Sequence, residues 1–539
     1  MDRRKFAKDI AAGGLGLAGL SAASPLRTSF PEDRTFEPSL GDGADRPNLL
    51  FVMGDQLRTM SCGYAGDRYP GGTYAGEPAP YTPNLDRLAA QSTDFRNATS
   101  GYPMCAPHRA SLMTGKHPSS TGMVINELRA MPDPDAIAHV LDAHGYRTGF
   151  VGKWHLFGKH HGDRQQFVPP GPYRLGFDDY WAGFNFNHQY YKGAYYRDQF
   201  EEIPVEGFQP NTMADLAIGF MREAAADDND DRPFALFLLL GPPHDPFSWE
   251  NTPDTFEHLF KGEGKQFSDP PNFTTEGAHA RYWVPEWGHE WWMDNWYPKR
   301  FRYRAAYAAL TSALDWQIGR LMDFLDDEGL ADDTIFAFNS DHGEMFGSHG
   351  RIAKKIFYEE AARVPMLVRW PGQVEPQVTQ TPFDVVDTAP TLLGLMGLPI
   401  PESMEGMDLS HVARGEDGPR REAVLMQGMG HTYMWHNGDE WRAVRDERYT
   451  YAKPLDGAEL LFDHIDDPYQ TNNLVNDPDH RGVRRRLKGY MQKRMDDLND
   501  SFEKTTWYRD HWVEDRVIVR SATRELEPKY RPENIELAY

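Results

Sequence analysis

Short runs of apolar residues without polar alternation recur along most of the chain. The first covers residues 49–53 and ends directly on Gly54, Asp55 and Gln56. A continuous apolar run of this length is typical of a parallel strand that is buried on both faces. Similar segments predict four further strands, within residues 147–158, 233–247, 332–344 and 363–372.

Amphipathic segments separate these apolar runs and predict helices. They cover residues 82–92, 134–146, 211–225, 301–328 and 384–397. In the first of them, Thr82 is expected to cap the helix and Pro83 to occupy its first turn. Strands that alternate with helices predict an α/β fold, with a mostly parallel central sheet covered by helices.

The pattern changes near residue 420, which predicts a division of the chain. Short strands and a helix near 480–499 indicate a smaller C-terminal α+β subdomain over residues 420–505, after a catalytic α/β domain over residues 45–415. Residues 25–46 are polar and rich in proline and aspartate, as expected of a linker. Residues 506–539 are charged with little periodicity and predict an extended C-terminal tail.

Polar residues follow four of the predicted strands. They are Asp55 and Gln56, Lys153 and His155, His244, and Asp341 with His342. Ligands of such sheets bind outside the carboxyl ends of the strands, so these groups are expected to share one site.

Each group also has a purely structural interpretation. Asp55 with Gln56, and Asp341 with His342, could be turn or helix-cap residues. Lys153 and His155 could be an exposed pair that points to one side of an extended segment. His244, between prolines, could be a structural histidine. Together, however, two carboxylates and an amide oxygen predict a hard metal site that suits Ca²⁺ or Mg²⁺.

The composition restricts the partners and the redox chemistry. The 539 residues carry a net charge of −24, which argues against nucleic acid and anionic membrane as partners. An enzyme of this charge that acts on anions needs local cations inside a cleft. The two cysteines, Cys62 and Cys105, give no disulfide framework. A single bond between them would exclude Cys105 as a nucleophile.

Residues 101–118 combine a cysteine with a predicted helix start. Cys105 stands in CAPHR, four positions before Arg109, and SLMTG follows as the first turns of a helix. A thiol at a helix N-terminus beside a cation is electrostatically primed. The stretch resembles the C-x-P-x-R signature of type I, formylglycine-dependent sulfatases of the alkaline phosphatase-like superfamily, and the match continues through Leu112, Thr114, Gly115 and Pro118.

The resemblance implies that Cys105 is oxidised to formylglycine, whose hydrate attacks sulfate esters. It implies a metal site with the members Asp55, Gln56, Cys105, Asp341 and His342. Many relatives have Asp in place of Gln56 and Asn in place of His342, which leaves the choice between Ca²⁺ and Mg²⁺ open. His108 replaces a common serine within the signature.

The resemblance also implies catalytic roles for five further residues. Arg109 would hold the hydrate, Lys153 would contact it and the sulfate, and His155 would be the base that expels sulfate. His244 would protonate the leaving alcohol. In KKIFYEEAARVP, which is similar to the family's K-x-x-x-Y-E-x-x-x-R-V-P, Lys354 would bind the sulfate.

The N-terminus predicts export. Residues 1–30 contain Arg3 and Arg4 before a short run rich in glycine and alanine, which resembles a twin-arginine signal and is too short for a membrane span. A disordered basic tail is the alternative. Export would make the protein periplasmic or secreted, with the twin-arginine machinery and a formylglycine-generating enzyme as partners.

Aromatic insertions suggest the substrate. Residues 281–303 are rich in tryptophan and residues 184–198 in tyrosine, so these segments are either carbohydrate platforms or packed core. We expect a sulfuric ester hydrolase that releases sulfate from a sulfated polysaccharide or oligosaccharide. The alternatives are a phosphonate or phosphate ester hydrolase with the same aldehyde, and a non-catalytic glycan-binding protein with unmodified Cys105.

Overall fold

The computed structural model describes residues 46–126, 128–158, 166–227, 230–262, 267–282 and 284–515, with side chains only as far as residue 511. The predicted export signal and nearly all of the predicted linker lie outside these ranges. A central sheet of eight strands has the order β11-β2-β10-β9-β1-β8-β4-β5. Its strands are β1 (Asn48–Asp55), β2 (Thr93–Phe95), β4 (Arg147–Lys153), β5 (Tyr180–Phe184), β8 (Phe234–Pro243), β9 (Thr334–Ser340), β10 (Met366–Arg369) and β11 (Gln377–Thr379).

The middle of this sheet is parallel, as predicted. β9, β1, β8, β4 and β5 are neighbours and run in one direction. β10, the fifth predicted strand, is antiparallel to β9 and β2, which agrees with a sheet that is mostly but not wholly parallel. An apolar run reports burial on both faces, which is the same for either strand direction, so the sequence pattern could not resolve this point.

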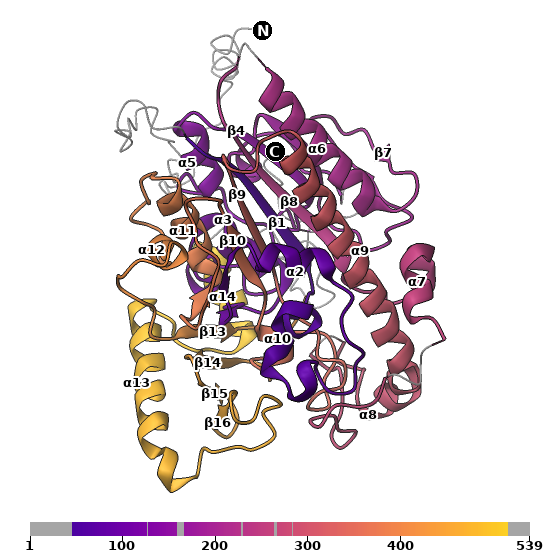
Figure 1. Ribbon diagram of the computed structural model, residues 1–539. Coiled ribbons are helices and arrows are strands. Elements are labelled where there is room, and N and C mark those ends of the chain that lie inside the picture. Colours follow the sequence, from indigo (N-terminus) through magenta and orange to yellow (C-terminus); the bar gives the residue numbers. More distant parts are fainter. Residues whose placement is uncertain are drawn as a thin grey trace, which may run out of the picture. The chain divides into compact units, whose positions relative to one another are not determined.

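Helices cover both faces of the sheet (Figure 1), which explains the absence of polar alternation in β1. Leu49 and Phe51 pack into one core, together with residues of α3 (Cys105–Thr114), α5 (Ile137–Ala143) and α11 (Thr388–Leu395). Leu50 and Val52 pack into the other core, against α2 (Pro83–Ala89), α6 (Gln209–Ala226) and α9 (Arg300–Asp327). Successive side chains of a strand point to opposite faces, so both faces must be apolar.

The predicted α2 begins where expected but ends at Ala89, before the predicted residue 92, and it has a different cap. Pro83 is its first residue and Thr82 precedes it, yet the Thr82 side chain makes no capping hydrogen bond. Its Oγ1 instead accepts from Gly63 N. The helix N-terminus is satisfied by Asp315 of α9, whose carboxylate accepts from Leu85 N at 2.7 Å.

A smaller antiparallel sheet forms the C-terminal part, as predicted. It contains β13 (Val424–Gly428), β14 (Trp441–Arg445), β15 (Tyr449–Pro454) and β16 (Leu460–Asp463), and α13 (Arg481–Asp497) packs on it through Leu487 and Met491. The start of the predicted extended tail is wrong, because α14 covers Thr505–Asp515. Tyr508 is buried there and its hydroxyl accepts a hydrogen bond from Arg442, so a tertiary contact holds a helix that has little periodicity of its own.

The remaining α-helices and β-strands of the described residues are short connections. They are β3 (Ala98–Thr99), α4 (Pro118–Thr121), β6 (Ala194–Tyr195), β7 (Ile203–Pro204), α7 (Asp254–Phe260), α8 (His289–Trp291), α10 (Glu359–Ala362), β12 (Phe383–Asp384) and α12 (Ser410–Ala413). In the tryptophan-rich segment, Trp292 and Trp296 are buried, so these two side chains are packed core. Within the described residues, no helix combines the length and apolarity needed to cross a bilayer.

Candidate functional site

Four adjacent strands of the central sheet deliver the predicted residues to one edge. β9, β1, β8 and β4 are consecutive, and Gly54 pairs with Ser340 while Asp55 pairs with Pro243. Asp55 therefore lies between Asp341 on one side and His244 on the other. The convergence expected from strand ends alone is confirmed.

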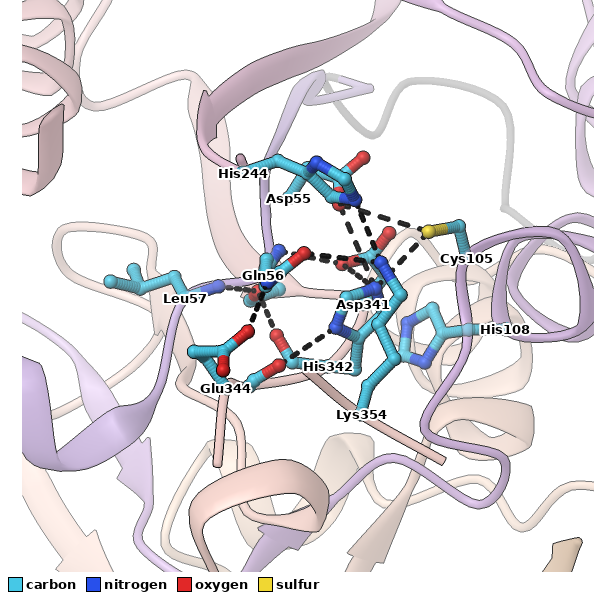
Figure 2. Close-up of polar contacts among 12 residues, drawn as sticks. Asp55, Gln56, Leu57, Cys105, His108, His244, Asp341, His342, Glu344 and Lys354 are labelled. Atoms are coloured by element: carbon cyan, nitrogen blue, oxygen red, sulfur yellow. Dashed lines mark hydrogen bonds and ion pairs between the residues drawn. The ribbon is translucent and has the colours of Figure 1, made fainter. Parts of the chain in front are cut away.

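Asp55 is the anionic centre of this cluster (Figure 2). Its Oδ2 accepts from Lys153 Nζ at 2.5 Å and from Arg109 Nη2 at 3.0 Å. All three side chains are fully buried. Burial alone would raise the pKa of Asp55, but Lys153 and Arg109 outweigh it and hold that pKa well below the usual range. Asp55 is therefore a carboxylate at any working pH.

Arg109 links the nucleophile helix to the sheet. It projects from α3, donates from Nη2 to Asp341 Oδ2 at 3.3 Å and from Nη1 to the carbonyl of Lys153 at 2.5 Å. One guanidinium thus joins the ends of β1, β4 and β9. A rigid planar fork suits this bracing role better than a flexible ammonium does.

Cys105 begins α3 and points at the carboxylates. Its Sγ lies 3.1 Å from His342 Nε2 and 3.9 Å from Asp55 Oδ1, and neither Cys105 nor Cys62 is in a disulfide. Burial, followed by the charge of Asp55, raises the pKa of Cys105 to about 11, so these surroundings do not favour the thiolate that a position at a helix N-terminus suggested. Arg109 is engaged by the carboxylates of Asp55 and Asp341.

His342 is oriented as a metal ligand. Its Nδ1 lies 2.9 Å from the carbonyl of Gly343 and therefore carries the proton. The unprotonated Nε2 then faces Asp341 Oδ1 at 3.6 Å and Asp55 Oδ1 at 3.7 Å. Ligand atoms of Asp55, Cys105, His244 and His342 all lie within 4.8 Å of one another, so the residues present fit a divalent cation.

Gln56 reaches the same cluster through a strained backbone. It has φ of 67°, and its N–H donates to Asp341 Oδ1 at 3.0 Å. The side-chain amide donates to Glu344 Oε2 at 2.5 Å, and its oxygen accepts from Lys354 Nζ at 3.1 Å. Glu344 thereby orients the amide so that its oxygen faces the site, as a metal ligand requires.

His244 and Lys354 form a hydrogen-bonded pair in the same cluster as Cys105. Lys354 Nζ lies 2.7 Å from His244 Nε2, and His244 Nδ1 lies 2.9 Å from the carbonyl of Asp245. Burial, then the charges of Lys354 and Lys153, lower the pKa of His244 well below its ordinary value. The imidazole is therefore neutral, with Nδ1 donating and Nε2 accepting the ammonium proton of Lys354.

His188 is a site residue that the sequence pattern did not identify. Its ring stacks on His244 with centroids 3.7 Å apart, and its Nε2 lies 3.4 Å from Lys153 Nζ. The only signal in the sequence is that His188 lies within the aromatic segment 184–198. A histidine in a loop cannot be assigned to a strand-end site without knowing where the loop folds back.

His155 does not lie as predicted. β4 ends at Lys153, and His155 has φ of 56° instead of an extended conformation. Its ring packs 4.7 Å from Phe186, and neither ring nitrogen finds a hydrogen-bond partner among the described residues. The argument from strand alternation, which placed Lys153 and His155 on one side, therefore fails. Burial, then the charges of Lys153 and Arg109, lower the pKa of His155.

Comparisons with known proteins agree with this geometry. Residues 47–398 match the family model described as Sulfatase, and residues 347–497 match the model described as N-sulphoglucosamine sulphohydrolase, C-terminal. The chain belongs to the sulfatase family. Sulfatases hydrolyse sulfuric esters, and this sulfatase has the alkaline phosphatase-like fold that its motifs implied.

Among its relatives, this sulfatase is 32% identical to the ulvan-active sulfatase of Formosa agariphila, over 87% of this chain and 84% of the relative. It is 26% identical to an endo-4-O-sulfatase of Bacteroides thetaiotaomicron, over 89% of this chain and 96% of that one. The crystal structure of a putative sulfatase from Bacteroides fragilis superposes with a TM-score of 0.70 at 26% identity, covering 86% of this chain and 98% of the other.

Proposed function

We propose that this sulfatase releases sulfate from a sulfated polysaccharide or its oligosaccharides, with Cys105 converted to formylglycine. The observation that carries the proposal is the enclosure of Cys105 by two carboxylates, one lysine and two histidines from four strand ends, together with Lys354 from the segment between β9 and α10. The carbohydrate substrate is supported by relatives named for ulvan and for endo-4-O-sulfate removal.

The metal would be held by Asp55, Asp341, His342 and the amide oxygen of Gln56, beside residue 105. Three oxygen donors and one imidazole favour Ca²⁺, with Mg²⁺ as the alternative. A bound divalent ion would stabilise negative charge on residue 105 and on the sulfate oxygens. Formylglycine would supply a hydrated aldehyde as nucleophile, with a second hydroxyl from which sulfate can leave.

The cations of the chain would bind the sulfate. Lys153 contacts Asp55 and Lys354 contacts Gln56, and each would donate to sulfate oxygens, while Arg109 keeps Asp55 and Asp341 in register. The proposed proton transfer to the leaving alcohol uses the Lys354–His244 pair, which shares one proton between Nζ and Nε2. His155 would be the base of the second step, from a position in which its ring nitrogens are uncommitted.

The proposal includes export to the periplasm or beyond through the twin-arginine machinery, after oxidation of Cys105 by a formylglycine-generating enzyme. Arg3 and Arg4 support this part. Comparison of the mature N-terminus in periplasmic and cytoplasmic fractions tests it. An intact N-terminus that stays in the cytoplasm would refute it.

The direct test measures the mass of the peptide containing Cys105 and the turnover of three esters. Co-expression with a formylglycine-generating enzyme should give the aldehyde mass, and activity on p-nitrophenyl sulfate should exceed activity on a phosphonate monoester. Sulfate release from algal or animal glycans should follow. An unmodified thiol with tight glycan binding and no turnover would instead establish a binding protein.

A further inference from the structure

A second cationic cluster lies beside the site, around Lys355. The Lys355 side chain is fully buried, yet its Nζ makes no hydrogen bond to any described residue. The carboxylate of Asp439 lies 3.9 Å away, which is beyond hydrogen-bonding distance. A buried ammonium without hydrogen bonds lowers stability, so its retention calls for a ligand that compensates it.

The backbone separates Lys355 from the neighbouring Lys354. Lys355 has φ of 72°, its N–H donates to the carbonyl of Pro103, and its carbonyl accepts from Trp441 Nε1 at 3.2 Å. Lys354 Nζ therefore faces the sulfate site, whereas Lys355 points toward the β13–β14 loop, residues 429–440. Because the two residues are consecutive, with Cα atoms about 3.8 Å apart, the second cluster begins at the point in the chain where Lys354 leaves for the sulfate site.

Three segments build this cluster. The Tyr282 hydroxyl accepts from Ile352 N at 2.7 Å, and the Tyr282 carbonyl accepts from Thr432 Oγ1 at 2.9 Å. The Arg351 guanidinium lies over the Tyr282 ring, 4.2 Å from its centroid. The tryptophan-rich segment, the active-site loop and the C-terminal sheet thus meet here.

His431 adds a hydrogen-bond acceptor. The residue is buried, and its Nε2 lies 2.8 Å from the carbonyl of Arg281, so Nε2 carries the proton. Burial, then the charge of Lys355, lowers the pKa of His431 to about 4, which keeps the ring neutral. Nδ1 is then a lone-pair acceptor, and it has no partner among the described residues. A sugar hydroxyl would satisfy it.

We propose that Lys355, Arg351 and His431 form a subsite for a second anionic group of the substrate, a carboxylate or a further sulfate on the glycan beyond the ester that is cleaved. This inference rests on the proposed carbohydrate substrate. Asp439, whose side chain is 20% exposed, is an ion partner of Lys355 at 3.9 Å without a hydrogen bond, and the anion of the substrate would displace it. Glu440 does not compete, because its carboxylate is engaged by Thr505 and Gly438.

The test uses two variants with opposite expected effects. Lys355→Met keeps the volume and removes the charge, and Asp439→Asn removes the competing carboxylate. The probes are p-nitrophenyl sulfate, which has one anionic group, and a sulfated oligosaccharide that contains uronic acid. The measured quantity is the ratio of kcat/KM for the oligosaccharide to kcat/KM for the aryl sulfate.

Lys355→Met should lower this ratio about 10- to 100-fold, the range for loss of one charge-assisted contact, and mainly through KM. Asp439→Asn should raise the ratio. Lys488→Met, which removes a half-exposed charge on α13, is the control and should leave the ratio at the wild-type value. Equal ratios for all variants, or a lower ratio for both Lys355→Met and Asp439→Asn, would overturn the proposal.

Two further measurements identify the second anionic group and distinguish failure of the subsite from failure of the proposed function. If reduction of the uronate carboxyls removes the Lys355→Met effect, the second anion is a carboxylate; if the effect persists, it is a sulfate. If the wild-type protein hydrolyses no sulfate ester, the proposed function fails, and calorimetric titration with the oligosaccharide then tests the subsite alone. Equal affinity of wild type and Lys355→Met in that titration would refute the subsite.

Discussion

Asp55→Asn should destabilise the metal-free protein strongly while changing almost no volume. Asp55 Oδ2 is the shared acceptor of Lys153 at 2.5 Å and Arg109 at 3.0 Å. At an effective dielectric constant of about 20, these contacts correspond to about 7 and about 6 kcal/mol of attraction. Desolvation of the carboxylate offsets much of this, and removal of one partner of a buried pair costs about 3–5 kcal/mol. In the variant, Lys153 loses its carboxylate partner and Arg109 retains Asp341.

A matched control separates burial from contact distance. Asp198 accepts from Arg174 at 2.6 Å, a similar distance, but Asp198 is 69% exposed and Arg174 also donates to the carbonyl oxygens of Val168 and Arg197. Asp198→Asn should therefore cost less than about 1 kcal/mol.

The assay is urea unfolding followed by tryptophan fluorescence and far-UV circular dichroism, after exhaustive dialysis against EDTA. The two variants and the wild type are compared at low and at 0.5 M salt. Added salt should shrink only the Asp198→Asn effect, because buried pairs are screened less. If both variants lose the same free energy of unfolding, the buried carboxylate is not the anchor of the two cations and the reasoning is refuted.

Three further predictions concern the metal, the pH dependence and the backbone. Removal of divalent ions should lower the thermal midpoint, and Ca²⁺ should restore it. In His342→Ala, the Ca²⁺ concentration needed for this restoration should rise about tenfold or more. An unchanged Ca²⁺ response would exclude His342 as a ligand. Burial, then the charge of Arg421, lowers the pKa of His117 to about 3 in the folded protein. Between pH 6.5 and 3 the unfolded chain therefore binds a proton on His117 that the folded protein does not bind. The free energy of unfolding falls as the pH decreases through this range. His117→Gln should reduce that slope by about 1.4 kcal/mol per pH unit in urea titrations, and an unaltered slope would contradict the assignment. Gly343→Ala would place a Cβ 1.9 Å from the Glu360 carbonyl oxygen and should cost several kcal/mol of stability. In the control Gly489→Ala, in α13, the added Cβ has no neighbouring atom within 4 Å, and the variant should be stabilised by about 0.5–1 kcal/mol. Similar thermal midpoints for the two variants would refute the packing argument.

The predictable part of the fold is the part that long apolar runs encode. β1, β4, β8 and β9 were found because five or more consecutive buried residues leave a clear pattern. β2 and β11, with three residues each, leave none, and the sequence pattern did not indicate them. α14 depends on the contact between Tyr508 and Arg442, which is invisible to local periodicity.

The site divides in the same way. Asp55 ends its strand, and His244 and Asp341 follow theirs directly, so topology alone brought them together. His155 lies beyond the strand end in a left-handed conformation, where alternation no longer applies. His188 comes from a loop, and the pKa of Cys105 depends on burial that an N-terminal helix position does not reveal.

The burial of Cys105 bears on the order of its proposed oxidation and the folding of the chain. The residue is 1% exposed and begins a helix of which all ten residues are buried. The active site of a modifying enzyme could not reach this side chain once α3 had packed against the sheet. The proposed oxidation of the Cys105 side chain, in which Cβ becomes the aldehyde carbon and the sulfur is lost, would therefore have to precede folding. The catalytic competence of each molecule would then be decided while its chain is still unfolded.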